Sequence, residues 1–426
     1  MPDIKLNPLY GLPHDVRFCR HCLMSNQKPH SVNETTHTSD SKKQTMGIDG
    51  DGLCDACRYA EQKESHIDWE ARERVLLSTL DKYRRHDGRY DVIVSGSGGK
   101  DSMMTAHMLK YKYGMHPLTV TWSPHMYTDV GWQNMQNWIN IGGFDNLLFT
   151  ANGQVMQKLT YEAFENLYFP FQPFKFGIKF WAAKMALKFD VDLVMYGEPY
   201  VEYGSTPLKE GETAGLGLEY FVNDAKDIYL GGLHTDALKA KYNLTDNDLL
   251  PFMPLRSKDV KGSRVKVEYL GWYVKWDPQK AYYYAVENCG FVPDDERTEG
   301  THGKYASIDD RIDGLHYYTH YIKFGLGRCT FDASHEIRNG HLTREEGIAL
   351  VKKYDGELPR RYFNDCLKYM GISEDTFWER TDRARSPHLW VKDGGQWRLR
   401  HSVIDTADTG EQTPENLRYE YLRGPA

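Results

Sequence analysis

Apolar and polar positions follow two different periods along the middle of the chain. Four short apolar runs have the length of buried strands: 91–94, 117–122, 146–149 and 191–196. Three segments between them have apolar residues at helical spacing: 101–112, 130–140 and 175–188. Strands that alternate with helices predict a doubly wound α/β fold, a parallel sheet with helices on both faces. Ligands of such sheets bind beyond the carboxyl ends of the strands, so we expect the loops at 95–102, 122–129 and 197–203 to converge.

Other patterns surround this central region. Residues 67–85 have helical spacing and are predicted to connect it to the N-terminal part. The glycine-rich stretch 204–236 is interpreted either as a lid or as an irregular surface connection. Beyond residue 251 the chain is predicted to be mainly helical, and Thr343 with Glu346 forms a capping box before an apolar run. We therefore expect three domains: 1–66, 67–250 and 251–426.

The turn after the first predicted strand has the composition of a phosphate-binding loop. It reads Ser97-Gly98-Gly99-Lys100-Asp101-Ser102 and opens a predicted helix. Small residues let the backbone approach an oxyanion, and unpaired N–H groups at a helix start favour negative charge. An ordinary glycine–serine turn between a strand and a helix is the alternative interpretation.

The details of this loop exclude two common phosphate-binding motifs. A Walker A loop needs Ser or Thr after its Gly-Lys pair, whereas Asp101 follows Lys100. The dinucleotide fingerprint needs a third glycine where Asp101 stands. The loop resembles the pyrophosphate-binding loop of the ATP pyrophosphatases (the PP-loop). That resemblance implies ATP as a co-substrate, with its β- and γ-phosphates held and its α-phosphate open to attack.

Four of the seven cysteines form two closely spaced pairs, Cys19 with Cys22 and Cys54 with Cys57. This spacing is typical of a tetrahedral Zn²⁺ site. The polar residues between the pairs offer little core, so zinc would supply folding energy to a ribbon-like module. A redox dithiol or an iron–sulfur centre is the alternative.

Composition narrows the functional classes. The formal net charge of −7 argues against a protein whose main role is nucleic-acid binding. No apolar run is long enough to span a bilayer and no export signal is recognisable, so we expect a cytoplasmic protein without membrane insertion.

Two further segments carry candidate chemistry. Glu198 directly follows the last predicted strand, where a carboxylate can orient substrate, hold Mg²⁺ or accept a proton; a solvated loop acid is the alternative. Tyr203 lies nearby. The segment 321–345 interleaves cations with glycines, as phosphate or diphosphate-linked sugars require, although a charged helical face would contain similar residues. Its candidates are Lys323, Arg328, Asp332, His335, Arg338 and Arg344.

Nearly the whole chain resembles the N-acetyl sugar amidotransferases of bacterial surface-polysaccharide, O-antigen and nonulosonic-acid (pseudaminic or legionaminic acid) pathways. The resemblance includes the paired cysteines and these segments: 97–102, 121–134, 171–180, 196–204, 270–278, 323–346 and 351–359.

The resemblance implies an AMP-forming ligase-type reaction on a nucleotide-linked sugar. The acetamido oxygen attacks the α-phosphate of ATP, and ammonia then displaces AMP to leave an acetamidino group. The catalytic residues expected from it are Lys100, Asp101, Glu198, Lys323 and Arg328. ATP would contact Ser97, Gly98, Gly99, Lys100, Asp101, Ser102, Thr121 and Trp122, with Mg²⁺ bridging its phosphates. The sugar substrate would contact Tyr203, Asp332, Arg338 and Arg344.

Ammonia requires a source. The chain begins Met1-Pro2, so it lacks the N-terminal cysteine of one glutaminase class, and Cys289 and Cys329 do not lie in the elbow of the other. Together with the resemblance, this predicts a separate glutaminase partner and a cyclase-like subunit that channels ammonia. The alternative function is tRNA thiolation, because some tRNA sulfurtransferases also join paired cysteines to such a loop.

Overall fold

The computed structural model describes residues 6–31, 34–406 and 418–419. Its strands are β1 (Val92–Ser95), β2 (Pro117–Trp122), β3 (Asp145–Phe149), β4 (Leu193–Tyr196), β5 (Gly215–Leu216), β6 (Tyr229–Leu230), β7 (Leu233–His234), β8 (Lys266–Tyr269), β9 (Trp390–Asp393), β10 (Gln396–Leu399) and β11 (Arg418–Tyr419). Its α-helices are α1 (Asp55–Ser65), α2 (Trp69–Tyr83), α3 (Lys100–His107), α4 (Asp129–Asn140), α5 (Gly153–Leu167), α6 (Gln172–Phe189), α7 (Thr235–Tyr242), α8 (Asp246–Leu249), α9 (Ser257–Val260), α10 (Leu270–Tyr273), α11 (Pro278–Cys289), α12 (Asp313–Phe324), α13 (Arg328–Arg338), α14 (Arg344–Tyr354), α15 (Phe363–Met370) and α16 (Glu374–Ala384). Shorter turns are η1 (Glu34–Thr36), the π-helical η2 (Met108–Lys112), η3 (Tyr200–Tyr203), η4 (Leu208–Glu212), η5 (Leu218–Phe221), η6 (Leu250–Phe252) and η7 (Val403–Thr406).

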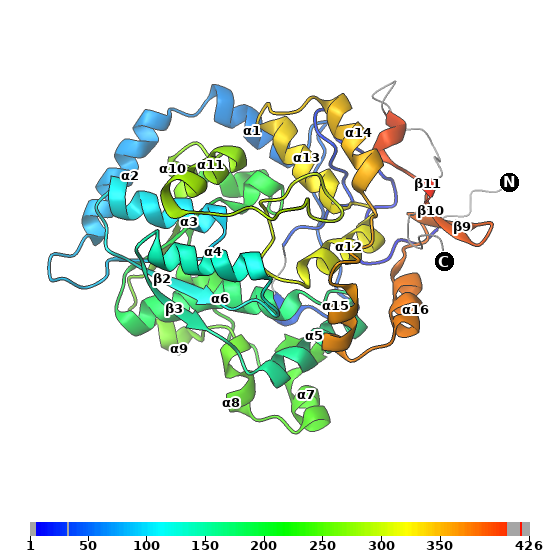
Figure 1. The fold of residues 1–426 in the computed structure, drawn as a ribbon. Helices are drawn as coiled ribbons and strands as arrows, with labels where there is room; N and C mark the ends of the chain where they lie inside the picture. Colours follow the sequence, from blue (N-terminus) through cyan, green and yellow to red (C-terminus); the bar gives the residue numbers. More distant parts are fainter. Residues whose placement is uncertain (1–5, 32–33, 407–417, 420–426) are drawn as a thin grey trace.

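A six-stranded sheet organises the first part of the molecule, in the order β3-β2-β1-β4-β8-β5. Its pairs are parallel except for the edge strand β5, which runs antiparallel to β8. This confirms the mixed α/β fold with a mainly parallel sheet that the alternating pattern predicts. The chain leaves β1 toward β2 and returns on the other side of β1 as β4, so the strand order reverses beside β1 (Figure 1). Ligands of such sheets bind where the order reverses.

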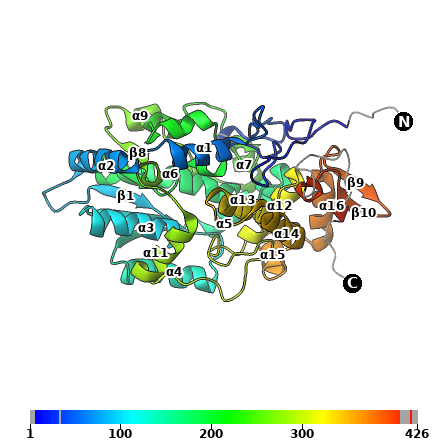
Figure 2. The same ribbon diagram turned by 90° about the horizontal axis from the view of Figure 1, so that it is seen from above.

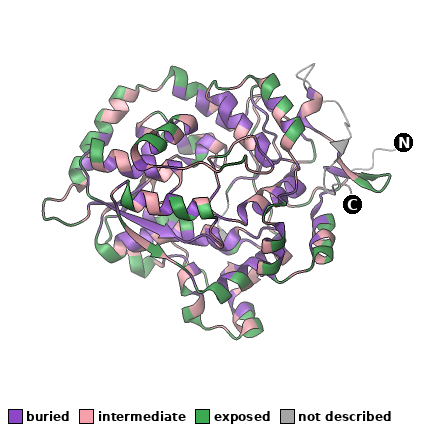
Figure 3. Ribbon diagram, in the orientation of Figure 1, coloured by how far each residue is buried: buried purple, intermediate pink, exposed green. Residues whose placement is uncertain are grey.

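The two faces of the sheet bury different residues, because successive strand side chains point to opposite sides. Val92 and Val94 pack with α3 and α4, whereas Ile93 packs with α6. Figure 2 shows α3 and α4 on one side of β1 and α6 on the other. The burial colouring of Figure 3 follows this arrangement, with the central strands β1, β2 and β4 and the inner faces of these helices mostly buried.

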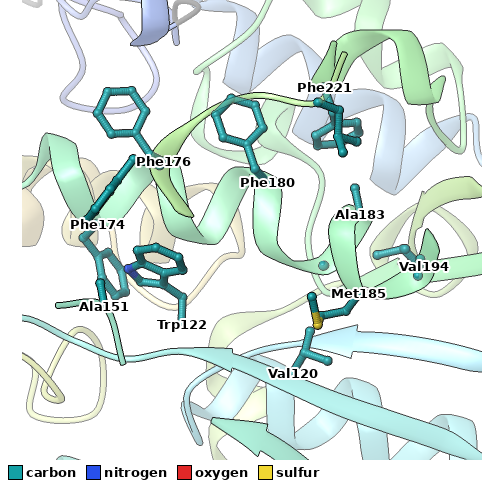
Figure 4. Packing of buried hydrophobic residues seen from close by; sticks show 14 of the residues in the cluster. Val120, Trp122, Ala151, Phe174, Phe176, Phe180, Ala183, Met185, Val194 and Phe221 are labelled. Atoms are coloured by element: carbon teal, nitrogen blue, oxygen red, sulfur yellow. The ribbon is translucent and has the colours of Figure 1, made fainter. Parts of the chain in front are cut away.

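Aromatic residues dominate the α6 side of the sheet. Phe176 and Phe180 of α6 lie over Val120 and Trp122 of β2 (Figure 4). A Cβ on Gly177 would meet the ring of Trp122 at 2.0 Å, so only glycine lets the helix approach this closely. Trp122 is therefore a packed core residue.

The glycine-rich stretch 204–236 is anchored to the core. It supplies β5 to the sheet, and Leu218, Phe221 and Leu230 are buried against α6 and its neighbours. This packing favours a surface connection over a lid.

Beyond residue 250, helices α10 to α16 predominate, and the predicted capping box at Thr343 is present at the start of α14. The segment also contributes β8 to the central sheet, although it was expected to be mainly helical. No helix in the described ranges is both long and apolar enough to cross a membrane.

The four paired cysteines lie between the N-terminal segment and α13 and α14. They form one buried cluster with Leu23, Ile337, Ile348 and Val351. In Figure 1 the blue N-terminal segment accordingly lies beside the yellow and orange helices α13 and α14. The N-terminal part is thus packed against the C-terminal region.

Candidate functional site

The loop between β1 and α3 requires glycine at its centre. Gly98 has φ +83°, a conformation that residues with a Cβ rarely adopt, and its Cβ would lie 2.8 Å from backbone atoms of Asn134. Gly96 is equally constrained, since a Cβ there would lie 2.2 Å from the Cβ of Ser102. The loop is therefore packed closely against the start of α3 and the middle of α4.

The next glycine faces open space. A Cβ on Gly99 would meet no atom within 4 Å, and Gly99 is the N-cap of α3 without any side chain capping the helix. An uncapped helix N-terminus beside free volume can receive an anion, because the first N–H groups have no partner within the helix. This arrangement has the geometry that a phosphate cradle needs.

Lys100 and Asp101 form an ion pair at the mouth of this cradle. Lys100 is 6% exposed, and its ammonium lies 5.9 Å from the centre of the Tyr305 ring. The second carboxylate oxygen of Asp101, Oδ1, is buried without a hydrogen-bond partner. A buried, unpaired carboxylate oxygen is well suited to a cation or a water molecule that a ligand brings.

Glu198 approaches the same point from the neighbouring strand. The register pairs Val94 of β1 with Met195 of β4, so the loops that follow both strands emerge side by side. The hydroxyl of Tyr203 donates to Glu198 Oε1 at 2.9 Å. Burial, and then the nearby Asp101 carboxylate, raise the pKa of Glu198 to about 7, while Lys100 opposes the rise.

The Asp101 carboxylate raises the pKa of Glu198, and two neighbouring carboxylates suit a divalent cation. Asp101 and Glu198 would hold Mg²⁺, because hard oxygen ligands suit it and an unpartnered oxygen already faces this space. When bound, the ion would offset phosphate charge beside Lys100.

The C-terminal region covers the cradle from the opposite side with residues that the sequence patterns did not single out. The side chain of Ser97 hydrogen-bonds Asp309, and burial raises the pKa of that carboxyl. Asp313 lies at the start of α12, and burial raises its pKa to about 7, while the positive charge of Arg328 acts to lower it. The acidic run Asp309-Asp310 was the available signal, but nothing in its spacing links it to a loop two hundred residues earlier.

Arg328 is the predicted residue of the 321–345 segment that lies nearest this acidic group. It is 3% exposed, lies 4.7 Å from the centre of the Tyr317 ring, and donates to the carbonyl oxygen of Ala306. Its Nη1 has no hydrogen-bond partner. Asp332, four residues on, lies 3.6 Å from Arg328 Nε and accepts from Thr301. Arg328 thus retains a free donor for a ligand oxygen.

Lys323 does not lie at the cradle. Its ammonium donates to the carbonyl oxygen of Leu167 at 2.8 Å and lies 4.4 Å from the Tyr10 ring. The expected catalytic role for Lys323 has no support in this placement.

Arg338 and Arg344 lie at the cysteine cluster. The charges of Cys22, Cys57 and Cys54 act on Arg338, and those of Cys19 and Cys22 act on Arg344. Arg338 donates to the backbone oxygen of Glu202, and Arg344 donates to Thr406. Cations beside four thiolates offset their negative charge, so these positions indicate support of the metal site more than contact with a sugar.

The two residues expected at adenosine are also buried. Thr121 accepts from Asn146, and Trp122 packs against Phe149 and Phe252. Any contact they make with a nucleotide would have to come from their backbone atoms.

The cysteine cluster has the geometry of a zinc site. The four Sγ atoms lie within 4.8 Å of one another, and Cys19 to Cys57 and Cys22 to Cys54 are each 3.7 Å apart. A tetrahedral ion with Zn–S distances of about 2.3 Å would separate sulfurs by about 3.8 Å. The donor set and its size therefore suit Zn²⁺.

One helix links this cluster to the cradle. Helix α1 begins at Asp55, between the second pair of cysteines, and carries Lys63. The Lys63 ammonium lies 2.7 Å from Glu202, and both side chains are less than 5% exposed. Glu202 lies four residues after Glu198, so α1 and the cysteine cluster at its start hold the loop that presents Glu198.

Comparison with known proteins bears on the C-terminal region. Residues 299–403 match the family model described as LPS biosynthesis protein WbpG-like, C-terminal domain. No curated protein matches the chain. A solved structure of NMN synthetase from Francisella tularensis is similar at 14% identity with a TM-score of 0.25. That match covers 32% of this chain and 57% of that one, and a likeness of this size carries no argument about function.

The matched region contains α12, α13 and the acidic residues that face the cradle, as well as the helices that pack on the cysteine cluster. The match of this region to a lipopolysaccharide-biosynthesis domain supports the surface-polysaccharide family that the motifs of the chain resemble.

Proposed function

We propose that the protein is an ATP-dependent amidotransferase of the PP-loop ATP pyrophosphatase type, which converts an acetamido group of a nucleotide-linked sugar to an acetamidino group. The observation that carries this proposal is the convergence of the uncapped start of α3, the Lys100–Asp101 pair and Glu198 at one edge of the sheet. The match of residues 299–403 to a WbpG-like C-terminal domain supports a sugar substrate, since that family model is described as an LPS biosynthesis protein.

The chemistry needs activation before ammonia can react. An amide carbon is a poor electrophile and its oxygen is a poor leaving group. The amide oxygen attacks the α-phosphorus of ATP, and the bond to pyrophosphate breaks. Ammonia then adds to the O-adenylated imidate, AMP leaves with the former amide oxygen, and the amidine remains. A site that holds the outer phosphates and leaves the α-phosphate open suits this order of events.

The residues of the cradle divide these tasks. The N–H groups at the start of α3 and Lys100 would stabilise charge on the departing pyrophosphate. Glu198 and Asp101 would hold the Mg²⁺ that offsets phosphate charge beside Lys100. Arg328 Nη1 offers a donor to the sugar or its phosphate.

Ammonia is proposed to come from a separate glutaminase, with a cyclase-like subunit as the channel. The cysteines outside the cluster are poor nucleophiles: burial raises the pKa of Cys289 to about 12 and also raises the pKa of Cys329 and Cys366. The same observation disfavours tRNA thiolation, which needs a reactive sulfur carrier near the loop.

The test of the reaction is incubation with ATP, Mg²⁺, ammonium and a panel of UDP- and CMP-linked acetamido sugars. We expect AMP and pyrophosphate to form in step with a sugar product one mass unit lighter, since NH replaces oxygen. Production of ADP and orthophosphate would refute the mechanism. Glutamine should support turnover only when a glutaminase is added.

Two variants locate the reaction at the cradle. Lys100→Ala and Asp101→Ala should remain folded and lose at least about 100-fold in turnover, because each removes charge stabilisation in the transition state. Lys188→Ala, at an exposed position in the last turn of α6, is the matched control and should keep full activity. Equal activity of all three variants would place the chemistry elsewhere.

A further inference from the structure

A cavity of about 280 Å³ lies in the C-terminal region, and none of its lining residues belongs to the α3 cradle or the cysteine cluster. Its walls come from the loop after α11, the start of α12, the segment that leads into α15, and α15 itself. We call it the arginine cavity and define it by six of the residues that line it: Thr298, Ile308, Arg311, Leu315, Arg361 and Tyr362.

The cavity has an apolar inner part and a charged outer part. Ile308, Leu315 and Cys366 line it and are buried. Arg311 and Arg361 line it as well, and their side chains are partly exposed. Binding cavities of this kind combine an apolar surface with a few polar groups that orient the ligand. The matching ligand has a flat or apolar part at one end and a negative charge at the other.

The two arginines are oriented by neighbouring groups and still retain donors for a ligand. Arg311 donates from Nη1 to Asp365 at 3.0 Å and from Nε to the carbonyl oxygen of Tyr127 at 3.1 Å. Arg361 donates from Nη1 to Asp294 at 2.7 Å. A guanidinium group has five N–H donors, and the Nη2 group of each arginine makes no hydrogen bond to any described residue. These donors remain available to an oxyanion.

One tyrosine ring brings the two guanidinium groups together. The guanidinium carbons of Arg311 and Arg361 lie 5.3 Å and 5.2 Å from the centre of the Tyr362 ring. The two groups are therefore separated by no more than about twice that distance, which two linked phosphates with a hydrogen bond on each side can span. This spacing favours a diphosphate as the charged part of the ligand.

A buried hydroxyl group at the cavity lacks a partner. Thr298 Oγ1 is buried and makes no hydrogen bond to any described residue. Buried polar atoms are nearly always paired in folded proteins, so an unpaired atom beside a cavity indicates a ligand or an ordered water. The polar edge of a nucleobase can pair with this hydroxyl, and Ile308 and Leu315 offer an apolar surface to its ring.

The arginine cavity shares a wall with the α3 cradle. The first and last residues of the segment 308–310 line the cavity, whereas Asp309 between them hydrogen-bonds Ser97 of the cradle loop. A ligand in the cavity would thus lie on the opposite side of this segment from a ligand in the cradle.

Ser307 lies at the same wall and adjoins the candidate sugar-binding residues. It lines the cavity, and its Oγ lies 3.4 Å from the hydroxyl oxygen of Tyr317. The Tyr317 ring lies against Arg328, whose Nη1 has no hydrogen-bond partner among the described residues. A group attached to the ligand at Ser307 would therefore be close to Arg328.

We propose that the arginine cavity binds the nucleoside diphosphate of the nucleotide-linked substrate, with the phosphates at Arg311 and Arg361 and the base at the apolar inner part. The attached sugar would lie on the side of Ser307, near Arg328. This inference rests on the proposed function for the identity of the ligand. It assigns ATP and the sugar nucleotide to separate sites on the two sides of one wall.

The test is calorimetric titration of the protein saturated with Mg²⁺ and the α,β-methylene analogue of ATP, so that the cradle is occupied. The probes are UDP, dTDP and GDP. We expect at least one of them to bind. Its nucleoside and pyrophosphate should each bind at least about tenfold more weakly, because each fills only one part of the cavity and loses the contacts of the other.

Two substitutions separate the parts of the ligand. Arg361→Gln should weaken binding of the nucleotide and of pyrophosphate by about tenfold, because a charge-assisted hydrogen bond is lost. Thr298→Val should weaken binding of the nucleotide and of its nucleoside by about fivefold and leave pyrophosphate affinity unchanged, because only a neutral hydrogen bond to the base is lost.

The neighbouring arginine is the matched control. Arg360 is exposed and does not line the cavity, so Arg360→Gln should bind every probe as the native protein does. Affinity for the ATP analogue should change less than twofold in all three variants. Thermal unfolding confirms that each variant is folded.

The outcomes are distinct. Failure of all three nucleotides to bind, unchanged affinity in both Arg361→Gln and Thr298→Val, or equal weakening by Arg360→Gln would overturn the proposal. Nucleotide binding that depends on Arg361 and Thr298 in a protein that forms no AMP would leave the cavity assignment in place and refute the proposed reaction. Formation of AMP with an unchanged KM for the sugar nucleotide in both variants would refute the cavity assignment alone.

Discussion

At the scale of the residue, Glu198 illustrates how position converts an ordinary acid into a reactive one. It follows an apolar strand and lies beside Asp101 and Lys100, which come from the neighbouring strand's loop. Desolvation and like charge favour the protonated form, and the hydroxyl of Tyr203 and the ammonium of Lys100 favour the ionised form. The balance places its proton transfer near neutral pH.

This balance predicts a pH-dependent stability. The pKa of Glu198 is higher in the folded than in the unfolded chain, so the folded state binds more protons and its stability falls as pH rises between about 4.5 and 7. Glu198→Gln removes this loss and should stabilise the protein at pH 8 by about 1–2 kcal/mol, allowing for partial solvent screening. At pH 4 the difference should vanish, and urea unfolding at the two pH values measures it. An equal stability difference between Glu198→Gln and the native protein at both pH values would contradict the raised pKa of Glu198.

A second residue-scale prediction concerns the buried Lys63–Glu202 pair. Lys63→Met leaves the Glu202 carboxylate without its partner and should lower the free energy of unfolding by about 3–5 kcal/mol. The double variant Lys63→Met/Glu202→Gln has no buried charge at this pair and should recover at least half of the loss. Chemical unfolding of both variants measures the energetic coupling between Lys63 and Glu202. Equal destabilisation of the single and the double variant would show that the charges of the pair do not cause the loss of stability.

At the scale of the element, two adjacent glycines of the β1–α3 loop have different structural roles. Gly98 satisfies a steric demand, because its φ is positive and backbone atoms of Asn134 occupy the space beside it. Gly99 has an ordinary φ of −72° and open space around it, so a side chain there would meet only a ligand.

Alanine substitutions separate these tasks. Gly98→Ala should destabilise the fold by at least about 2 kcal/mol, through positive φ and steric overlap. Gly99→Ala should cost less than about 1 kcal/mol of stability and still weaken ATP binding, because its methyl group would occupy the cradle. Thermal unfolding measures the change in stability, and ATP titration measures the change in affinity. An unchanged ATP affinity in Gly99→Ala would mean that phosphate does not enter there.

At the scale of the whole molecule, the cysteine cluster connects the N-terminal segment and the C-terminal helices to the loop that carries Glu198. Its apolar surroundings come from α13 and α14, Leu23 N donates to Ser334 of α13, and α1 leads from Cys57 to Lys63 and Glu202. A metal ion at this point would brace both the C-terminal region and the loop that carries Glu198.

Removal of the metal should therefore affect catalysis at a distance. Cys22→Ser should lower zinc content, measured by elemental analysis, and reduce thermal stability strongly, because metal binding supplies folding free energy to such modules. Cys366→Ser, at a buried cysteine outside the cluster, is the matched control and should retain one zinc per chain. Equal zinc content in both variants would contradict the assignment of the four ligands.

The local features of this protein could be predicted from sequence because each depends on a short stretch of chain. The apolar runs predicted β1 to β4 nearly to the residue, the glycines and Lys100 predicted the turn between β1 and α3, and cysteine spacing predicted the four-cysteine cluster. Strand β8 was missed because its four residues lie within a helical region, and only their pairing with β4 and β5 makes them a strand.

The residues that sequence alone determined are those whose chemistry follows from their immediate neighbours. Tertiary structure decided which distant groups lie together: Asp309 beside Ser97, Lys323 beside Leu167, and Arg338 at the cysteines. The physical reason is that burial and electrostatic interaction depend on distance in space, and helical periodicity places a side chain on a face without saying what that face will meet.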